Sequence, residues 1–396
     1  MKPLFLSVVI GAILILSGCQ KYKPLGEPIT LGLIAPMTGS LASSGEAIQR
    51  GMLLAMDEIN AGGGVLGQPL ELRVRDVQNN PEEGIKALRE LVEKEKITAV
   101  FGGIFSPVMV AQLDTLKELQ IPLINPWGSM TAITKSGQSP NYAFRVSVSD
   151  EQADEFLVRY AVEILGARRP GILADTSGWG EANLAGIRHW LDRLELEEAG
   201  TVRFDQGETD MRAGLERLKE AGADSLLMVA NAPEGAAIAR SRALLDWEVP
   251  VVSHWGISGG RFTDMAGSDN IQEVYTLQTV SFLGDLSQRK QEILKSYQHR
   301  FGIHEPEKIR SPVGVAHGYD GVHLLAMAIE RANSTEGTAV REALENLGEY
   351  KGVVKTYNRP FTPSGHDALL AEDYIMTIWH DGQPIPAPQP GLSGTR

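Results

Sequence analysis

The hydrophobic pattern begins at residue 29 with an apolar run, ITLGLIAP, that has the length of a buried strand. The next segment, residues 46–60, repeats apolar positions at helical spacing, which predicts a helix with one buried face. The positions on that face are Ile48, Met52, Ala55, Met56 and Ile59. The glycines from Gly62 to Gly64 then predict the end of this helix.

This alternation of strand and helix continues in two runs along the chain. Apolar runs of strand length are LELRVRD, TAVFGG and IPLINP in the first run, and PGILAD, TVRFD, DSLLMVA and VPVVS in the second. Helical periodicity lies between them, over residues 81–96, 106–119, 181–194, 211–221 and 235–247. Strands that alternate with helices favour parallel sheets covered on both faces, so the fold class is predicted to be α/β with two lobes.

Two details refine this pattern. Asn80 followed by Pro81 predicts a helix start, because asparagine caps free N–H groups and proline fits the first helical position. The segment YTLQTVSF, residues 275–282, is expected to carry the chain back to the first lobe, which helices over residues 286–300 and 318–333 would complete.

The N-terminus has a different pattern from the rest. Lys2 precedes the apolar run LFLSVVIGAILIL, and small residues close it, as in a secretory signal. The run is too short to span a membrane comfortably. Its ending, Leu16-Ser-Gly-Cys19, resembles a bacterial lipobox, which implies cleavage before Cys19 and lipid attachment to its sulfur. The alternative is an ordinary signal with an incidental cysteine. We therefore expect an extracytoplasmic protein, periplasmic or on the cell surface, anchored to the membrane by lipid.

Composition and charge narrow the classes of function. Of 396 residues, 43% are hydrophobic and 22% charged, which is typical of a soluble protein with a sizeable core. A net charge of −13 argues against nucleic acid as a partner. Cys19 is the single cysteine, which excludes an internal disulfide and a cysteine-based zinc or redox site. The histidines lack metal-binding spacing, so no metal or other cofactor is expected.

The predicted binding residues follow the strands. In open α/β sheets, ligands sit outside the carboxyl ends of the strands. Ser106 stands where a helix is predicted to begin, so its hydroxyl and the free N–H groups there suit a carboxylate; Ser129 stands similarly after IPLINP. Simple helix capping is the alternative for both. The candidates after the strands are Ser44, Ser106, Trp127, Ser129, Trp179, Asn231, His254 and Trp255.

Residues 256–260, GISGG, match the G-x-S-x-G pattern of a serine hydrolase, with Ser258 as the nucleophile. That pattern requires a helix to begin at the serine. Gly259 and Gly260 are poor residues for a first helical turn, so a catalytic role for Ser258 is disfavoured.

Several longer stretches resemble the substrate-binding proteins of branched-chain amino acid ABC transporters, the leucine-binding-protein-like family. The matching stretches are LGLIAPMTGS, EINAGGGVLG, VRDVQNNP, NYAFRVSVSDEQ, SGWGEANLAGI, ETDMRAGLERLKEAGAD and HGYDGVHLLAMAIERA, and the likeness covers residues 28–380. It implies the type I periplasmic-binding fold, with two doubly wound parallel-sheet lobes joined by three crossover strands and closing on a ligand. The implied division is 1–18 signal peptide, 19–28 lipidated tether, 29–146 with 281–350 lobe 1, 147–280 with 351–385 lobe 2, and 386–396 tail.

The resemblance also implies roles for single residues. Ser106 matches the carboxylate-binding serine of the family. Trp127 and Ser129 match the loop that holds the carboxylate and ammonium of the ligand, and Trp179 matches an aromatic residue, commonly tyrosine, that closes from the second lobe.

Two positions depart from the family pattern. The stretch 229–232 lacks the tyrosine that the family commonly has, and His254-Trp255 stands where it commonly has an acid. A buried ammonium without a counter-charge costs several kcal/mol, and a cation–π contact with Trp255 would offset only about 1–2 kcal/mol. A small carboxylate, aromatic or without the amine, is therefore favoured over a leucine-type ligand, with Glu234 or Asp175 as alternative counter-charges.

The sequence thus predicts a solute-binding protein that captures an amino acid or related small carboxylate and delivers it to an ABC permease, without chemistry on the ligand. The same fold serving as a ligand-sensing input to a membrane kinase or chemoreceptor is the first alternative. A serine hydrolase that uses Ser258 is the second.

Overall fold

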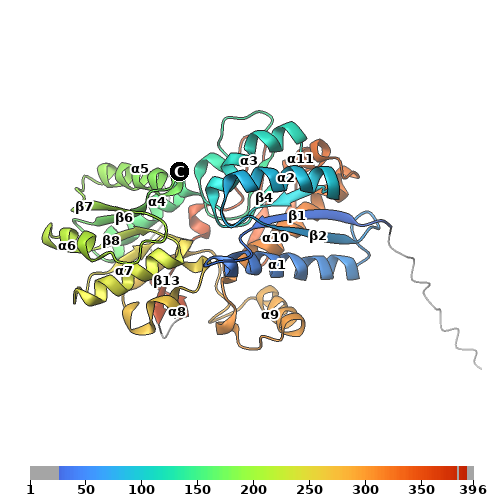
Figure 1. Ribbon diagram of the computed structural model, residues 1–396. Coiled ribbons are helices and arrows are strands. Elements are labelled where there is room, and N and C mark those ends of the chain that lie inside the picture. The colour runs from blue at the N-terminus through green and yellow to red at the C-terminus, as the bar shows by residue number, and fades with distance from the viewer. Residues whose placement is uncertain (1–25, 381–382, 390–396) are drawn as a thin grey trace, which may run out of the picture.

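The computed structural model describes residues 26–380 and 383–389. The predicted signal peptide, Cys19 and most of the predicted tail lie outside the described residues. Within the described ranges, no helix combines the length and apolarity needed to cross a membrane. Two α/β lobes lie side by side (Figure 1).

Lobe 1 is built on a five-stranded parallel sheet. Its strand order is β2-β1-β3-β4-β5. The strands are β1 (Ile29–Ala35), β2 (Leu70–Asp76), β3 (Ala99–Phe101), β4 (Leu123–Asn125) and β5 (Ala143–Arg145). The helices of this lobe are α1 (Ala42–Ala61), α2 (Pro81–Glu95), α3 (Ser106–Leu119), α9 (Gln288–Phe301), α10 (Pro312–Ala332) and α11 (Gly337–Leu344).

Helices cover both faces of this sheet. Leu31 and Leu33 of β1 belong to the apolar cluster of α1 and α10, whereas Ile34 belongs to the cluster of α2 and α3. Figure 1 shows α2 and α3 on one side of β1, with α1 and α10 on the other. Burial on both faces explains why β1 reads as an almost continuous apolar run.

Lobe 2 has a seven-stranded sheet in the order β14-β13-β10-β9-β8-β6-β7. Its strands are β6 (Gly171–Asp175), β7 (Gly200–Phe204), β8 (Leu226–Val229), β9 (Val251–Ser253), β10 (Val274–Gln278), β13 (Ile375–His380) and β14 (Gln383–Pro386). Strands β6 to β10 are parallel, while β13 runs antiparallel to both β10 and β14. The prediction of a parallel sheet therefore holds for all but one edge.

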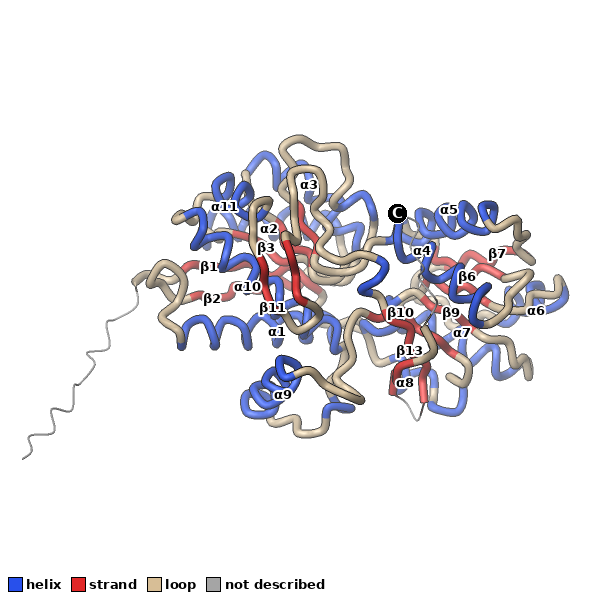
Figure 2. Tube along the Cα trace, turned by 180° about the vertical axis from the view of Figure 1, so that it is seen from behind, coloured by secondary structure: helices blue, strands red, loops and turns tan. Residues whose placement is uncertain are grey.

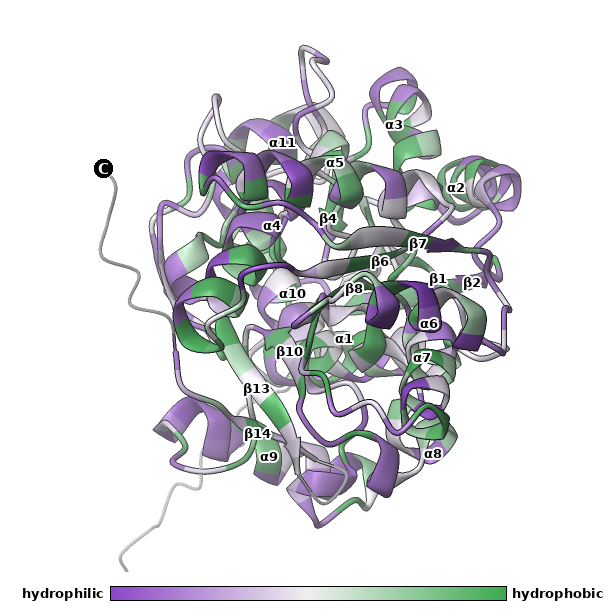
Figure 3. Cartoon of the chain, turned by 90° about the vertical axis from the view of Figure 1, so that its left-hand side faces the viewer, coloured by the Kyte–Doolittle hydropathy of each residue, from purple (hydrophilic) through white to green (hydrophobic). Residues whose placement is uncertain are grey.

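Two groups of helices enclose this second sheet. On one face are α4 (Asp150–Arg159), which a π-helical turn (Tyr160–Ile164) continues, and α5 (Gly178–Arg193). On the other are α6 (Arg212–Glu220), α7 (Ala232–Leu244) and α8 (Phe262–Ala266). Ile172 packs with the first group and its neighbour Leu173 with the second. Figure 3 shows the apolar strands β6 and β8 between α5 and α7.

The chain crosses between the lobes three times: from β5 to α4, from β10 toward α9, and from the segment after β12 into β13. Seen from behind, β10 and β13 lie side by side at the junction (Figure 2). The third crossing differs from the predicted boundary at residue 350. The hairpin of β11 (Glu349–Lys351) and β12 (Thr356–Asn358) packs on lobe 1 instead.

A buried carboxylate explains the position of this hairpin. Asp320 of α10 is fully buried and accepts hydrogen bonds from the Val353 and Val354 N–H groups at 2.8 and 3.0 Å. The Tyr357 hydroxyl donates to the same side chain at 3.1 Å. Residues up to Ala368, whose N–H donates to the Arg145 carbonyl, therefore remain with lobe 1.

The predicted elements are largely confirmed. The Asn80 side chain accepts from the Glu82 and Glu83 N–H groups and so caps α2 as expected. Helix α1 starts at Ala42, four residues earlier than predicted. The short strand β5 and helix α4 carry weak periodic signals and were not predicted.

Helices α1 and α10 approach each other closely because glycine lies at the contact. A Cβ atom at Gly51 would lie 2.0 Å from the Val315 carbonyl oxygen, and one at Gly318 would lie 2.5 Å from the Ile48 carbonyl oxygen. Neither oxygen can move without shifting a helix backbone, so a side chain at these positions would separate the two helices.

We expect Gly51→Ala to lower the free energy of unfolding by about 1–3 kcal/mol, the usual cost of overpacking a tight core. Denaturant titration measures the change. Gly348→Ala is the control, because a Cβ there meets no atom of the described residues within 4 Å, and it should shift stability by less than about 1 kcal/mol. Equal effects of the two substitutions would contradict the close helix contact.

Candidate functional site

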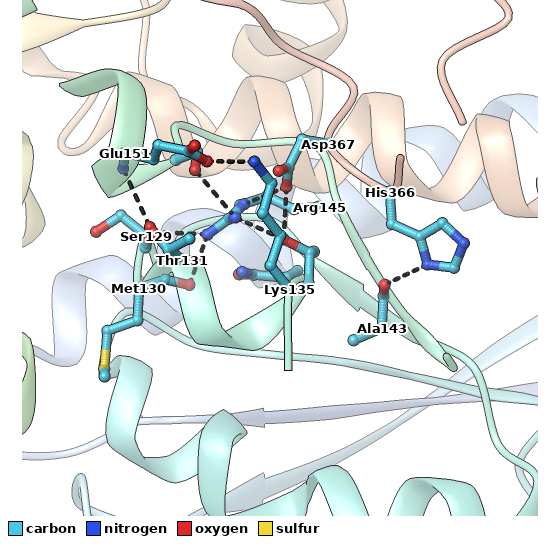
Figure 4. Close-up of polar contacts among 12 residues, drawn as sticks. Ser129, Met130, Thr131, Lys135, Ala143, Arg145, Glu151, His366 and Asp367 are labelled. Atoms are coloured by element: carbon cyan, nitrogen blue, oxygen red, sulfur yellow. Dashed lines mark hydrogen bonds and ion pairs between the residues drawn. The ribbon is translucent and has the colours of Figure 1, made fainter. Parts of the chain in front are cut away.

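A buried guanidinium organises the loop that follows β4. Arg145, at the end of β5, is 0% exposed. It donates to the carbonyl oxygens of Ser129 at 2.7 Å and Met130 at 2.9 Å, and to the Thr134 hydroxyl at 2.7 Å. Its Nε donates to Asp367 at 2.7 Å, as Figure 4 shows. Residues 129–134 are thereby fixed beneath the gap between the lobes.

The charge of Arg145 is balanced by the segment that carries the third crossing. Burial by itself would raise the pKa of Asp367, but the adjacent Arg145 guanidinium and the Thr134 hydroxyl hold it below its usual value. Asp367 is therefore ionised at neutral pH, and the pair joins β5 to the chain that leads into β13.

Ser106 connects α3 to this fixed loop. Its hydroxyl oxygen accepts from the Ser129 N–H at 3.0 Å and the Met130 N–H at 3.3 Å. Phe105, not Ser106, is the N-cap residue of α3, and no side chain caps that helix. The Ser129 hydroxyl likewise accepts from the Trp179 indole N–H, at 3.1 Å, and caps no helix. Simple capping, the alternative for both serines, is therefore not what the structure has.

Three tryptophans close the gap above these serines. Trp127 of lobe 1 and Trp255 of lobe 2 have ring centroids 5.4 Å apart, and Trp179 of lobe 2 donates to Ser129 of lobe 1. Both contacts cross between the lobes, so this is a closed arrangement. A small cavity, which we call the tryptophan cavity, lies between them. The residues that line it are Ile104, Phe105, Ser106, Trp127, Ser129, Trp179, Asn231, Trp255 and Gly256.

This cavity is too small for an amino acid in its present form. The space open to water centres is about 10 Å³, which is room for about one water molecule. Trp127 Nε1 is buried without a hydrogen-bond partner among the described residues. A ligand would therefore have to displace the tryptophan rings, and it would find an unused N–H donor among them.

Two of the predicted residues do not line the cavity. Ser44 is buried in the first turn of α1, where its hydroxyl donates to the Leu41 carbonyl at 2.6 Å. His254 lies behind Trp179, with ring centroids 5.2 Å apart. The other candidates are brought together as expected.

Asp150 is the acidic side chain that sequence reasoning missed. It is 3% exposed at the start of α4, and its Oδ1 lies 3.1 Å from His254 Nε2. Neither ring nitrogen of His254 has a hydrogen-bond partner in the described part of the chain. The Trp179 N–H also points to Asp150, at 3.4 Å. The one feature of the sequence that could have indicated Asp150 is its position directly after the segment that first crosses between the lobes.

The two acids proposed as substitutes lie elsewhere. Asp175 accepts from the Ser177 N–H at 2.9 Å, and Glu234 accepts from the Gly207 N–H at 2.8 Å. Burial raises the pKa of both carboxyls. None of the three acids lines the cavity, but Asp150 contacts the indole N–H of Trp179, which does.

Ser258 has the surroundings of a structural serine. It lies in a 3-10 turn (Trp255–Gly259), and its hydroxyl accepts from the Gln278 side-chain amide. An amide cannot remove a proton from a nucleophile. The Ser258 carbonyl accepts from Ser311 of lobe 1 at 2.7 Å, so this turn belongs to the contact between the lobes.

Comparison with known proteins agrees with this two-lobed architecture. The chain matches the family model of the periplasmic binding proteins over residues 28–382. It is 26% identical over 372 residues to the Leu/Ile/Val-binding protein BraC3 of Rhizobium johnstonii, covering 92% of this chain and 96% of that one.

Solved structures share the fold. The branched-chain amino acid transporter substrate-binding protein LivJ from Streptococcus pneumoniae, in complex with isoleucine, superposes with a TM-score of 0.79 at 23% identity, covering 90% of this chain and 97% of that one. An ABC transporter solute-binding protein from R. palustris, in complex with 4-hydroxybenzoate, gives 0.77 at 19% identity, covering 91% and 95%.

The fold and the closed gap between the lobes define a type I, two-lobed binding protein. The chain belongs to the periplasmic binding protein family, a family of solute-binding proteins rather than enzymes, and it is similar to branched-chain amino acid binding proteins. The family implies an extracytoplasmic location.

We expect Arg145→Met to destabilise the protein by about 3–5 kcal/mol at pH 7, because it leaves the Asp367 carboxylate buried without its partner. Denaturant titration as a function of pH measures this cost. The depressed pKa of Asp367 means that the stabilisation from the pair is present above about pH 4 and is lost below it. The difference from the wild type should therefore shrink in acid.

Arg188→Met is the matched control, because Arg188 pairs with Glu198 at the surface with a side chain 48% exposed. Its loss should cost about 1 kcal/mol or less. An equally small effect of Arg145→Met would show that the loop holds its shape without the buried pair.

Proposed function

We propose that this protein captures a small carboxylate between its lobes and delivers it to an ABC permease, with lipid on Cys19 holding it at the membrane. The observation that carries the proposal is the cavity where Ser106 and Ser129 of lobe 1 meet Trp179 and Trp255 of lobe 2. A ligand that contacts both sides stabilises the closed arrangement over the open one, which is how such proteins signal occupancy.

The carboxylate end of the ligand fits the lobe 1 side. Helix α3 starts at Ser106, and the positive end of its dipole favours an anion there. The Ser129 and Met130 N–H groups, which now donate to the Ser106 oxygen, are donors that a carboxylate could share. Charge-assisted hydrogen bonds of this kind are stronger than the neutral ones they replace.

The other end of the ligand fits the tryptophans. Trp127 and Trp255 present ring faces and one unpaired indole N–H. A flat aromatic acid can stack between such rings and accept from that N–H. The R. palustris relative in complex with 4-hydroxybenzoate supports a ligand of this class, and we favour it.

An amino acid is the second candidate, and Asp150 is the observation that favours it. Its carboxylate lies just behind Trp179, beside a His254 ring whose nitrogens have no hydrogen-bond partner within the described ranges. If Trp179 turned outward, an ammonium group could reach Asp150. The S. pneumoniae relative in complex with isoleucine supports this class.

We expect Ser106→Ala and Ser129→Ala each to weaken binding of the carboxylate at least about tenfold, since each removes a hydrogen bond to a charged group. Calorimetry with 4-hydroxybenzoate and with isoleucine measures the dissociation constants. Ser44→Ala is the matched control, because that buried hydroxyl is used within α1. Unchanged affinity in both Ser106→Ala and Ser129→Ala, or an equal loss of affinity in Ser44→Ala, would contradict the assigned carboxylate site.

We expect Trp255→Glu to move preference toward isoleucine, because it places a carboxylate where the family commonly keeps one. The ratio of the two dissociation constants is the readout. Trp255→Gln is the control, because glutamine has the shape of glutamate without its charge. It should bind isoleucine no more tightly than the wild type does. If selectivity is the same for Glu and Gln, a counter-charge at residue 255 does not decide the ligand.

A further inference from the structure

A second and much larger cavity lies beside the 255–259 turn. Its volume open to water is about 360 Å³, within the range of small-molecule sites. Lobe 2 contributes Phe262, Gln278 and Trp379, and lobe 1 contributes residues 307–312. The Ser258 carbonyl accepts from Ser311 here, and the residues that line this cavity are all different from those that line the tryptophan cavity.

One wall of this cavity holds a buried acceptor without a donor. Gln278 is 2% exposed, and its amide N–H group donates to Ser258 while its Oε1 has no partner among the described residues. Leaving a buried amide oxygen unpaired is costly. A molecule that brings a hydroxyl or amine N–H to this atom would remove that cost.

Cationic side chains also line this cavity. Arg261 Nε donates to Asp264 at 2.8 Å, and Arg310 lies 3.1 Å from the same carboxylate. Each guanidinium has five N–H donors, so one shared carboxylate leaves several of them available. The Lys308 side chain, which pairs with Glu305, adds a third cation, against Asp264 and Glu307 as the anions of the lining.

Two aromatic rings belong to the same lining. Phe262 and Trp379 have ring centroids 5.0 Å apart, and Trp379 uses its indole N–H on Thr276 at 2.7 Å. The rings therefore offer apolar surface and no free donor. The lining therefore combines an unpaired acceptor, cationic groups and apolar rings.

We propose that this cavity is a second binding site, for a small organic anion that carries a hydrogen-bond donor at its other end. The anion lies against Arg261 and Arg310, and the donor reaches Gln278 Oε1. The occupant touches both lobes at a place that no ligand of the tryptophan cavity reaches. The inference does not depend on which ligand the tryptophan cavity takes.

The test uses 3-fluoro-4-hydroxybenzoate, an anion with a hydroxyl donor, titrated to millimolar concentration and observed by fluorine NMR. The wild type should show a bound signal that Arg310→Ala weakens at least about fivefold, as expected for a lost charge-assisted contact. Arg89→Ala is the matched control, because Arg89 also pairs with one surface acid, Glu118, at 2.6 Å. It should leave the affinity unchanged.

Ser106→Ala separates the two sites. A bound signal that persists in Ser106→Ala and weakens in Arg310→Ala supports the second site, whether or not the tryptophan cavity binds the probe. A single signal that responds only to Ser106→Ala overturns the second site and leaves the proposed function intact. No bound signal, or equal effects of Arg310→Ala and Arg89→Ala, also overturns it. Gln278→Leu, which removes the acceptor at similar size, should weaken the same signal.

Discussion

The buried guanidinium of Arg145 is the group on which the arrangement of this protein depends. Its donors hold the carbonyl groups of residues 129 and 130 on one side and Asp367 on the other. It also reaches the Ser149 hydroxyl, at 3.2 Å, in the first crossing segment. One side chain therefore ties the cavity loop to two of the three connections between the lobes. A buried cation must have such partners, because an unpaired charge in this position would be costly.

From this fixed loop, the closed gap follows by contact. Ser129 is held from below by Arg145 and accepts from Trp179 from above. Trp127 leaves the same loop and meets Trp255 across the gap. At the small cavity the lobes thus meet through aromatic rings and one hydrogen bond, and little space is left between them. Such a surface suits a ligand that is itself flat or apolar, with one charged end.

The structure shows what surrounds His254 and Trp255, which stand where the family commonly has an acid. An acid from another element, Asp150 of α4, lies beside His254. The ring of Trp179 stands between Asp150 and the cavity, so this carboxylate is held back from the space where a ligand would bind. In the proposed site, the position of Trp179 therefore decides whether a ligand can reach the Asp150 carboxylate.

The sequence by itself determined the alternation of strands and helices, the cap at Asn80 and the cluster of serines and tryptophans after the strands. Those features depend on local periodicity and on the rule that parallel strands end at one edge of a sheet. Only the tertiary structure decided that Ser44 turns into α1, that the 349–358 hairpin stays with lobe 1, and that Asp150 is the acid near the cavity. Each of these rests on a hydrogen bond or a charge in a buried place. The Asp320 carboxylate and the Arg145 guanidinium are paired by residues more than 30 and 200 positions away. No local pattern encodes such partners, because they are chosen by what the fold brings within reach.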